Sequence, residues 1–226
     1  MATTVVFEER VEIPLDLRSL ADFRRWAMSD DFPERGRIDY IAGRIEVDMS
    51  PEDFFCHGTL KTEILAVLHR RVKGENLGHL VSDRTRVSSV EADLSAEPDI
   101  VFLSHETLHT GRARLVPKAG SEPGRYIEVE GAPDLVVEIV SDSSVQKDTR
   151  RLPEAYFQAG VPEFWLADAR GQDLLFQIQV RGESGYRAVE PDSEGFQKSA
   201  IFACGFRLDG GRDAQGNWAF DLREKE

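Results

Sequence analysis

The sequence predicts an α/β fold in which helices flank a mixed β-sheet, and three features support this prediction. Residues 135–140 (LVVEIV) form an apolar run typical of a central strand that is buried on both faces. Residues 134–168 then follow the order strand, helix and strand, with Gly160 closing the helix. Residues 55–72 carry the apolar stripe of an amphipathic helix that can cover such a sheet.

Composition limits the class of protein. The chain has 226 residues and two cysteines, Cys56 and Cys204, whose spacing excludes a zinc ribbon and favours a reducing compartment. The acidic N-terminal segment does not resemble a signal peptide, and no apolar run approaches the length of a membrane span. We therefore expect a cytoplasmic protein with no membrane partner, built as a single domain over residues 1–226. Its core should span about residues 36–170, followed by a strand-rich extension over about 171–226.

The charge balance also bears on partners. The formal net charge is −13, from 28 Lys and Arg against 41 Asp and Glu. This balance argues against a protein that binds polyanions over its whole surface, and it leaves room for a local basic cleft.

The N-terminal part predicts a helix and a hairpin. Residues 16–30 place apolar side chains at helical spacing, and Pro33 and Gly36 end that helix. Residues 37–50 alternate apolar and polar side chains on either side of an Ala-Gly turn, which indicates a β-hairpin. A first acidic candidate, Asp39, lies on this hairpin.

The next part predicts a helix and two strands. The amphipathic helix 55–72 has His57 at its start. Residues 79–89 and 96–104 are predicted strands, and the second places Asp99 between a proline and a short apolar run.

The remaining elements follow from breakers and apolar runs. Residues 117–133 are rich in Gly and Pro and are predicted to form a loop. After the strand 135–140, a polar turn leads into a helix that ends near Ala159. Pro153 fits this helix only within its first turn, so regular helix should begin at Thr149 or later. Further strands are predicted at 163–168 and, in the C-terminal part, at 173–180, 185–190, 199–208 and 217–222.

Two carboxylates stand out because they lie in strands that should be buried. Glu138 interrupts the most apolar run, with Asp134 four residues before it, and Asp99 directly precedes another such run. A buried ionised carboxylate needs a cation, a metal ion or a raised pKa. If the two strands are neighbours, Asp99 and Glu138 can converge on a magnesium ion, which prefers oxygen ligands. For each position taken alone, capping of a strand end or pairing with a buried arginine is the favoured explanation.

Several motifs in this order resemble a known family. They read RIDYIAGRIEV, EPDIVFLS, APDLVVEIVSDSS, YFQAGVPEFWLAD and GFRL. Together they are similar to the Uma-type family of nucleases, whose fold resembles the restriction-endonuclease, or PD-(D/E)XK, core; the resemblance covers about Leu20 to Leu208. It implies a metal-dependent endonuclease with Asp99 as the first metal ligand and Glu138 as the second. We expect DNA as the substrate, Mg²⁺ or Mn²⁺ as the cofactor, and a homodimer.

The chain departs from the family pattern at the catalytic lysine. Val140 stands two residues after the second carboxylate, where restriction endonucleases have lysine, and Leu152 stands where the resemblance places the lysine on the next helix. Lys147 and Arg151 flank the vacant position. Arg151 can stabilise a phosphate but is a poor proton acceptor, whereas Lys147 can do either if the turn brings it back over Glu138.

The other candidates leave alternatives open. Asp39 matches an acidic hairpin position of the family and is either a third metal ligand or an exposed carboxylate. His57 matches a histidine that opens the first core helix, as a base or as a cap. The leading hypothesis is an endonuclease. The alternatives are a non-cleaving module of the same fold that binds nucleic acid or protein, and a structural module that dimerises through residues 174–222.

Overall fold

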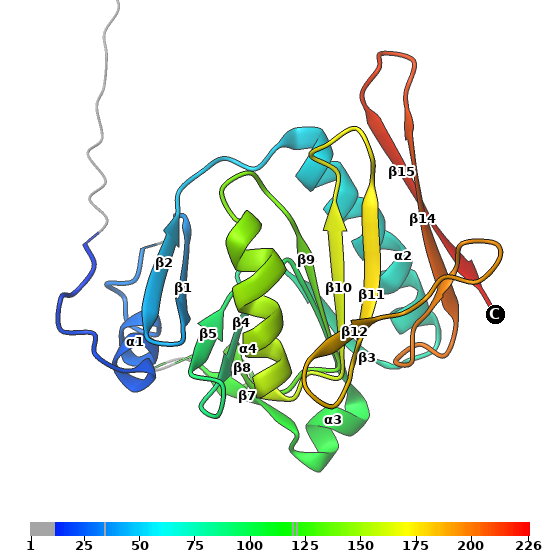
Figure 1. The fold of residues 1–226 in the computed structure, drawn as a ribbon. Coiled ribbons are helices and arrows are strands. Elements are labelled where there is room, and N and C mark those ends of the chain that lie inside the picture. The colour runs from blue at the N-terminus through cyan, green and yellow to red at the C-terminus, as the bar shows by residue number, and fades with distance from the viewer. Residues whose placement is uncertain (1–11, 34, 119, 121) are drawn as a thin grey trace, which may run out of the picture.

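The structure is a computed structural model that describes residues 12–33, 35–118, 120 and 122–226. Their strands form two six-stranded mixed sheets and one three-stranded antiparallel sheet, with helices packed on them (Figure 1). The predicted α/β class with helix-flanked mixed sheets is therefore confirmed. Among these residues, no helix is both long and apolar enough to cross a membrane.

The first sheet contains the predicted hairpin. Its strand order is β2 (Arg44–Asp48), β1 (Arg37–Ile41), β5 (Leu94–Ala96), β4 (Arg86–Ser89), β8 (Tyr126–Gly131) and β7 (Ala113–Pro117). Helix α1 (Leu20–Ala27) packs against β1, and the Ser19 hydroxyl caps its first turn by accepting from the Asp22 N–H at 3.2 Å.

The loop predicted over 117–133 is wrong for Tyr126–Gly131, which forms β8. This strand pairs with β7 on one side and β4 on the other, so its backbone is hydrogen-bonded on both edges. Glycine at position 131 is required there, because its φ is 109° and a Cβ would come within 2.4 Å of the Arg112 carbonyl oxygen. The Gly and Pro residues thus mark the ends of a strand as well as a loop.

The second sheet holds the central strand. Its order is β12 (Tyr186–Ala188), β11 (Leu175–Arg181), β10 (Glu163–Asp168), β9 (Leu135–Ile139), β6 (Ile100–Ser104) and β3 (Gly78–Ser82). All five residues of β9 are buried, and β9 lies between β10, which is parallel to it, and β6, which is antiparallel. The apolar run 135–140 therefore forms a central strand, as predicted.

Two helices cover opposite faces of this sheet. Helix α2 (Leu60–Gly74) packs against Leu135, Val137 and Ile139, and helix α4 (Leu152–Ala159) packs against Val136 and Val140. In Figure 1 α4 lies in front of the sheet and α2 behind it. Each helix is preceded by a π-helical turn, Phe54–Thr59 before α2 and Lys147–Arg151 before α4. Pro153 lies in the first turn of α4, directly after the π-helical turn.

Residues 79–89 were predicted to form one strand but form two, in different sheets. Asp83 and Arg84 between them have positive φ values of 47° and 52°, and this turn moves the chain from β3 to β4. Helix α3 (His105–Thr110) was not predicted either. It follows β6 directly, and Ser104 caps it by accepting from the Thr107 N–H at 3.0 Å.

Asp134 stabilises the fold at this corner. Its carboxylate accepts from the Ser104 N–H at 2.6 Å and from the Thr107 hydroxyl at 2.9 Å, and it forms an ion pair with Arg112. These donors satisfy both oxygens, so this carboxylate has a structural role.

The C-terminal sheet consists of β13 (Gln197–Lys198), β14 (Gly205–Arg212) and β15 (Trp218–Lys225). The hairpin of β14 and β15 lies beside α2 and projects past its end (Figure 1). Residues 199–204 were predicted as strand but form a turn, which Glu163 holds by accepting from the Ser199 hydroxyl at 2.6 Å and the Ala200 N–H at 2.8 Å.

Candidate functional site

Glu138 lies in β9, and Asp99 directly precedes β6, the neighbour of β9 in the second sheet. Strands β6 and β9 are antiparallel with Ile100 opposite Val137, so Asp99 and Glu138 form the next pair in the same register. The Asp99 carboxylate also accepts from the Ile139 N–H at 2.8 Å, which fixes it against β9. The fold therefore brings together the two carboxylates that the resemblance selects, at one end of these strands.

Glu138 is fully buried and only half satisfied. Its Oε1 accepts from the Tyr156 hydroxyl at 2.6 Å, and no hydrogen-bond partner reaches its Oε2 among the described residues. Burial and the nearby carboxylates of Asp99 and Asp148 raise the pKa of Glu138 well above its ordinary value. A buried carboxylate oxygen without a donor is an atom that a cation can bind.

Asp99 is surrounded by cations. Its Oδ1 accepts from the Arg37 guanidinium at 2.9 Å and lies 3.9 Å from Lys61 Nζ, and its Oδ2 lies 3.5 Å from His57 Nε2. Burial alone would raise the pKa of Asp99, but His57 and Arg37 hold it below its ordinary value. Asp99 is thus ionised, and the alternative of a buried arginine partner is realised in Arg37.

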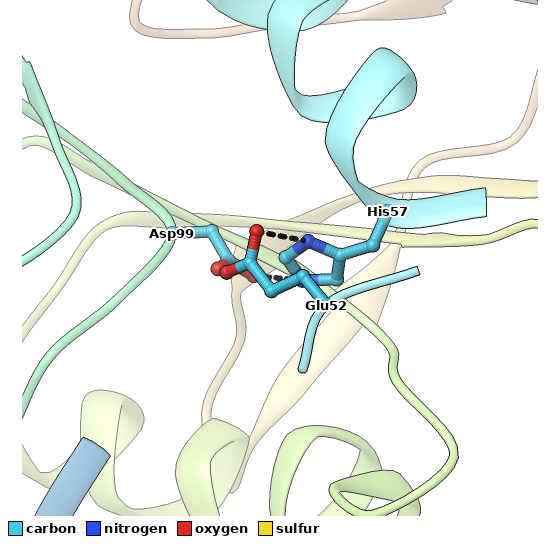
Figure 2. A group of neighbouring side chains, drawn as sticks. All are labelled: Glu52, His57 and Asp99. Atoms are coloured by element: carbon cyan, nitrogen blue, oxygen red, sulfur yellow. Dashed lines mark ion pairs between the residues drawn. The ribbon is translucent and has the colours of Figure 1, made fainter. Parts of the chain in front are cut away.

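A third carboxylate joins this group from a connecting segment. Figure 2 shows the carboxylates of Glu52 and Asp99 next to the His57 imidazole, each joined to the ring by a dashed line. Glu52 Oε2 lies 3.3 Å from His57 Nδ1, and ligand atoms of Glu52, His57 and Asp99 all lie within 4.8 Å of one another. The two carboxylates suit Mg²⁺ or Mn²⁺, whereas an imidazole suits softer divalent ions such as Fe²⁺ or Zn²⁺, so the donor types present fit a divalent ion.

His57 is both buried and charged. Burial lowers the pKa of His57, but the carboxylates of Asp99 and Glu52 outweigh that effect and raise it to about 9. At neutral pH the imidazole therefore carries a proton and cannot accept one, which disfavours the role of general base in this state.

This ion pairing predicts a pH dependence of stability. The pKa of His57 is 6.5 unperturbed and about 9 in the fold, so its contribution is complete below pH 6.5 and is lost as pH rises to about 9. The loss should amount to up to roughly 3 kcal/mol. We expect urea denaturation in EDTA to show this decline for the wild type. His57→Gln should lack this part of the decline, and equal slopes for the two proteins would contradict the assignment.

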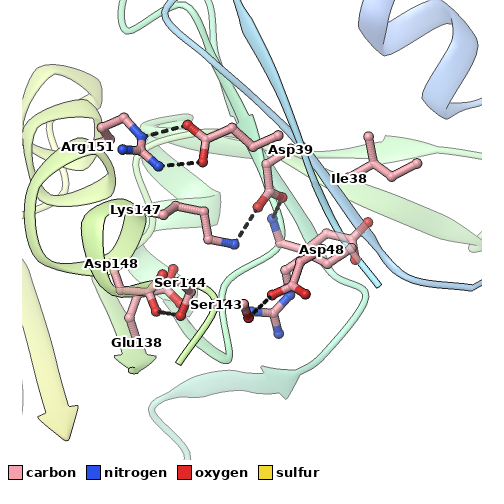
Figure 3. A network of polar contacts seen from close by, with 12 residues as sticks. Ile38, Asp39, Asp48, Glu138, Ser143, Ser144, Lys147, Asp148 and Arg151 are labelled. Carbon is pink, nitrogen blue, oxygen red and sulfur yellow. Dashed lines mark hydrogen bonds and ion pairs between the residues drawn. The ribbon is translucent and has the colours of Figure 1, made fainter. Parts of the chain in front are cut away.

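Asp39 and Lys147 form a buried ion pair next to Glu138. Lys147 Nζ donates to Asp39 Oδ2 at 2.9 Å, and the Glu97 N–H donates to Asp39 Oδ1 at 3.0 Å (Figure 3). Both side chains of the pair are almost fully buried. Asp39 is therefore not an exposed hairpin carboxylate, and its role as a metal ligand stays a prediction.

Arg151 points to a different partner. Its guanidinium makes two hydrogen bonds to Glu46, at 2.6 and 2.8 Å. In Figure 3 Lys147 extends between this pair and Asp148. A phosphate would have to compete with Glu46 for Arg151. Lys147 also has a carboxylate partner, Asp39, but its charge acts on Glu138, which that of Arg151 does not.

Asp148 adds another buried carboxylate beside Glu138. The Ser144 hydroxyl donates to its Oδ2, while no described donor reaches its Oδ1. Burial raises the pKa of Asp148 to about 6, although Lys147 and Ser144 lower it. The face of the sheet under α4 therefore holds more carboxylate than cation.

Access to these groups lies along the segment between β2 and α2. Three pockets, of about 390, 370 and 580 Å³, share Ser50 and Ser143 in their walls. The Ser143 hydroxyl donates to Asp48 at 2.7 Å and joins the two sides of this wall. His57 lines two of the pockets, and Asp99 lies directly behind it.

Sequence reasoning missed Arg37, Glu52, Lys61 and Tyr156. Lys61 lies one helical turn after His57, and Tyr156 one turn after the vacant lysine position, so helical spacing could have indicated both. Arg37 lies two residues before Asp39 in β1 and could have been found by strand spacing. Glu52 lies in an irregular segment, where spacing gives no signal.

Comparisons with known proteins bear on the family and the fold of this chain. The family model Uma2, described as "Putative restriction endonuclease", matches residues 20–210. A crystal structure from Anabaena variabilis, described as that of "a putative nuclease belonging to DUF820", has the same fold with a TM-score of 0.60 and 21% sequence identity. The alignment covers 82% of this chain and 90% of that one. Among curated proteins, no match to the sequence was found.

Proposed function

Because the chain belongs to the Uma2 family, we propose that it is a nuclease that uses Mg²⁺ or Mn²⁺ to hydrolyse phosphodiester bonds of DNA. The family match and the nuclease-like neighbour support nuclease function. The observation that carries the proposal is the pair Asp99 and Glu138 on adjacent strands, with one fully buried Glu138 oxygen lacking a donor. In Asp134, by contrast, donors reach both carboxylate oxygens.

The metal would be held by Asp99 and Glu138, with Asp39 as a further candidate. A divalent ion bound there would polarise a phosphate oxygen and lower the pKa of a bound water. The cations Arg37 and Lys61, which contact Asp99 in this structure, would then be released from Asp99, although Lys61 also pairs with Glu52 and Asp83.

The chain's own residues would assist in two ways. Lys147, next to Glu138, would orient the attacking water or stabilise the charge that develops on phosphorus. Arg151 could add a phosphate contact once released from Glu46. We expect weak cleavage, because Val140 and Leu152 are apolar and buried where a lysine would otherwise stand.

The direct test is nicking of supercoiled plasmid by the purified protein. We expect slow nicking that requires Mg²⁺ or Mn²⁺, that EDTA abolishes, and that returns when the metal is added back. Complete inactivity of folded protein over a metal titration, on both DNA and RNA, would contradict the proposal.

One observation favours a second function. Apolar side chains fill both positions where a lysine is expected, and they pack into the core between β9 and α4. A protein of this fold without that lysine could bind nucleic acid without cutting it. Metal-dependent binding of DNA without nicking would support this second function.

Homodimerisation and a cytoplasmic location remain part of the proposal. Light scattering tests the first, and cell fractionation tests the second.

A further inference from the structure

We propose that Arg37, His57 and Lys61 form a binding site for a substrate phosphate, and that the Glu52 carboxylate occupies this site in the absence of substrate. This inference rests on the proposed nuclease function and adds a site to it. It makes Glu52 an internal competitor of nucleic acid, and it makes Lys61 a phosphate-binding residue that the family pattern does not indicate.

The three cations converge on one carboxylate. Lys61 Nζ lies 2.9 and 3.0 Å from the two Glu52 oxygens, His57 Nδ1 lies 3.3 Å from Oε2, and an Arg37 nitrogen lies 4.0 Å from Oε1. These contacts, with that of His57 the largest, lower the pKa of Glu52 to about 2. Phosphate oxygens bind the same N–H donors with similar geometry, so a phosphate can replace this carboxylate.

Glu52 is more exposed to solvent than the His57 and Lys61 side chains that it contacts. The side chains of His57 and Lys61 are 4% and 10% exposed, whereas that of Glu52 is 46% exposed. Buried cations are held in place by their surroundings, and a half-exposed glutamate can leave by rotation of its side chain. Glu52, His57 and Arg37 line the pocket of about 390 Å³, so the space next to the carboxylate is open to a ligand.

The same geometry makes Glu52 a poorer metal ligand than Asp99, because the Lys61 ammonium lies closer to Glu52. A divalent ion between Glu52 and Asp99 would lie beside the Lys61 ammonium, which is 2.9 Å from one carboxylate and 3.9 Å from the other. Repulsion between a dication and an ammonium at such distances is strong in a buried site. An anion is attracted by Lys61, although Asp83, 2.8 Å from Nζ, offsets part of that attraction.

The test measures phosphate binding in EDTA, so it is independent of cleavage. We expect Glu52→Ala to bind inorganic phosphate about tenfold or more tightly than the wild type, because a competing charge-assisted contact is gone. Glu52→Gln should show a smaller gain of the same sign. Adding Lys61→Met to Glu52→Ala should remove the gain.

Asp142→Ala is the matched control, since it removes an exposed carboxylate from the rim of the neighbouring pocket. If Asp142→Ala gave an equal gain in phosphate binding, the gain would come from removing any negative charge near the site, and that result would overturn the proposal. So would unchanged phosphate binding in folded Glu52→Ala and Glu52→Gln, or loss of Mn²⁺ affinity in both without a gain for phosphate.

A second arm identifies the source of the phosphate. An oligothymidylate without terminal phosphates presents internal diesters alone, and we expect Glu52→Ala to strengthen its binding as well. A gain for inorganic phosphate but not for this probe would overturn the assignment to a substrate diester. Neither binding measurement needs catalysis. An inactive protein in the nicking assay would therefore not affect the phosphate-site proposal, and a failed binding test would not contradict the proposed nuclease function.

Discussion

Glu138→Gln is expected to lower metal-dependent nicking by roughly 10²- to 10³-fold and, at neutral pH, to stabilise the fold. The loss of activity follows from removing a metal ligand's charge, which is typical of the effect of one electrostatic group in a catalytic site. The gain in stability follows from the burial of Glu138, whose Oε2 has no described donor. Glutamine keeps the shape but carries no charge, so it removes the cost of burying an ionised carboxylate beside Asp99 and Asp148.

The sign of the pH effect is fixed by the direction of the shift. Since the pKa of Glu138 is raised above its ordinary 4.5, the folded protein retains a proton that the unfolded chain loses above that pH. Wild-type stability therefore falls as pH rises from 4.5 toward the folded pKa. The advantage of Glu138→Gln should be absent below pH 4.5 and largest above the folded pKa.

Urea denaturation at pH 4.5 and at pH 8, in EDTA, measures this difference. Glu163→Gln is the matched control, because Glu163 is equally buried but accepts hydrogen bonds from Trp165 at 2.7 Å and Ser199 at 2.6 Å. It should lose stability and keep its nicking activity. Loss of stability in Glu138→Gln as well would mean that Glu138 is structural.

Hydrophobic patterning in the sequence predicted two residues of this site, Glu138 and Asp99. The apolar run around Glu138 predicted a central strand, and the carboxylate within it was recognisable because burial makes its charge unfavourable. Asp99 was recognisable for the same reason. From the sequence, the two carboxylates were expected to converge only if β6 and β9 are neighbours. The structure pairs these two strands.

The rest of the site depends on contacts that periodicity does not encode. The pair of Asp39 with Lys147 joins the first sheet to the turn before α4, over 108 residues of chain. Glu52 comes from a segment without regular structure. The division of the strands into two sheets was also not predictable, because it depends on the chain turn at Asp83 and Arg84, whose φ values are positive.

The vacant lysine position leads to the last prediction, that Leu152→Lys raises metal-dependent nicking by about 100-fold, within the range of a positioned acid–base group. Leu152 lies one turn before Tyr156 on α4, and Tyr156 donates to Glu138 at 2.6 Å, so both side chains face the same part of the sheet. A lysine at position 152 could therefore reach the unpartnered Glu138 Oε2. Its ammonium would favour the ionised carboxylate, and the carboxylate would keep the lysine charged despite burial.

Leu152→Met is the control for this substitution, because methionine has similar length without the charge. It should nick no faster than the wild type. Adding Glu138→Gln to Leu152→Lys should abolish the gain and also destabilise the protein, because the buried ammonium then loses its counterion. If folded Leu152→Lys nicks at the wild-type rate, the lysine is not what limits this chain. The limit on nicking would then lie in the cations that hold Asp99. Arg37 lies 2.9 Å from the Asp99 carboxylate and would have to be displaced before a metal could bind.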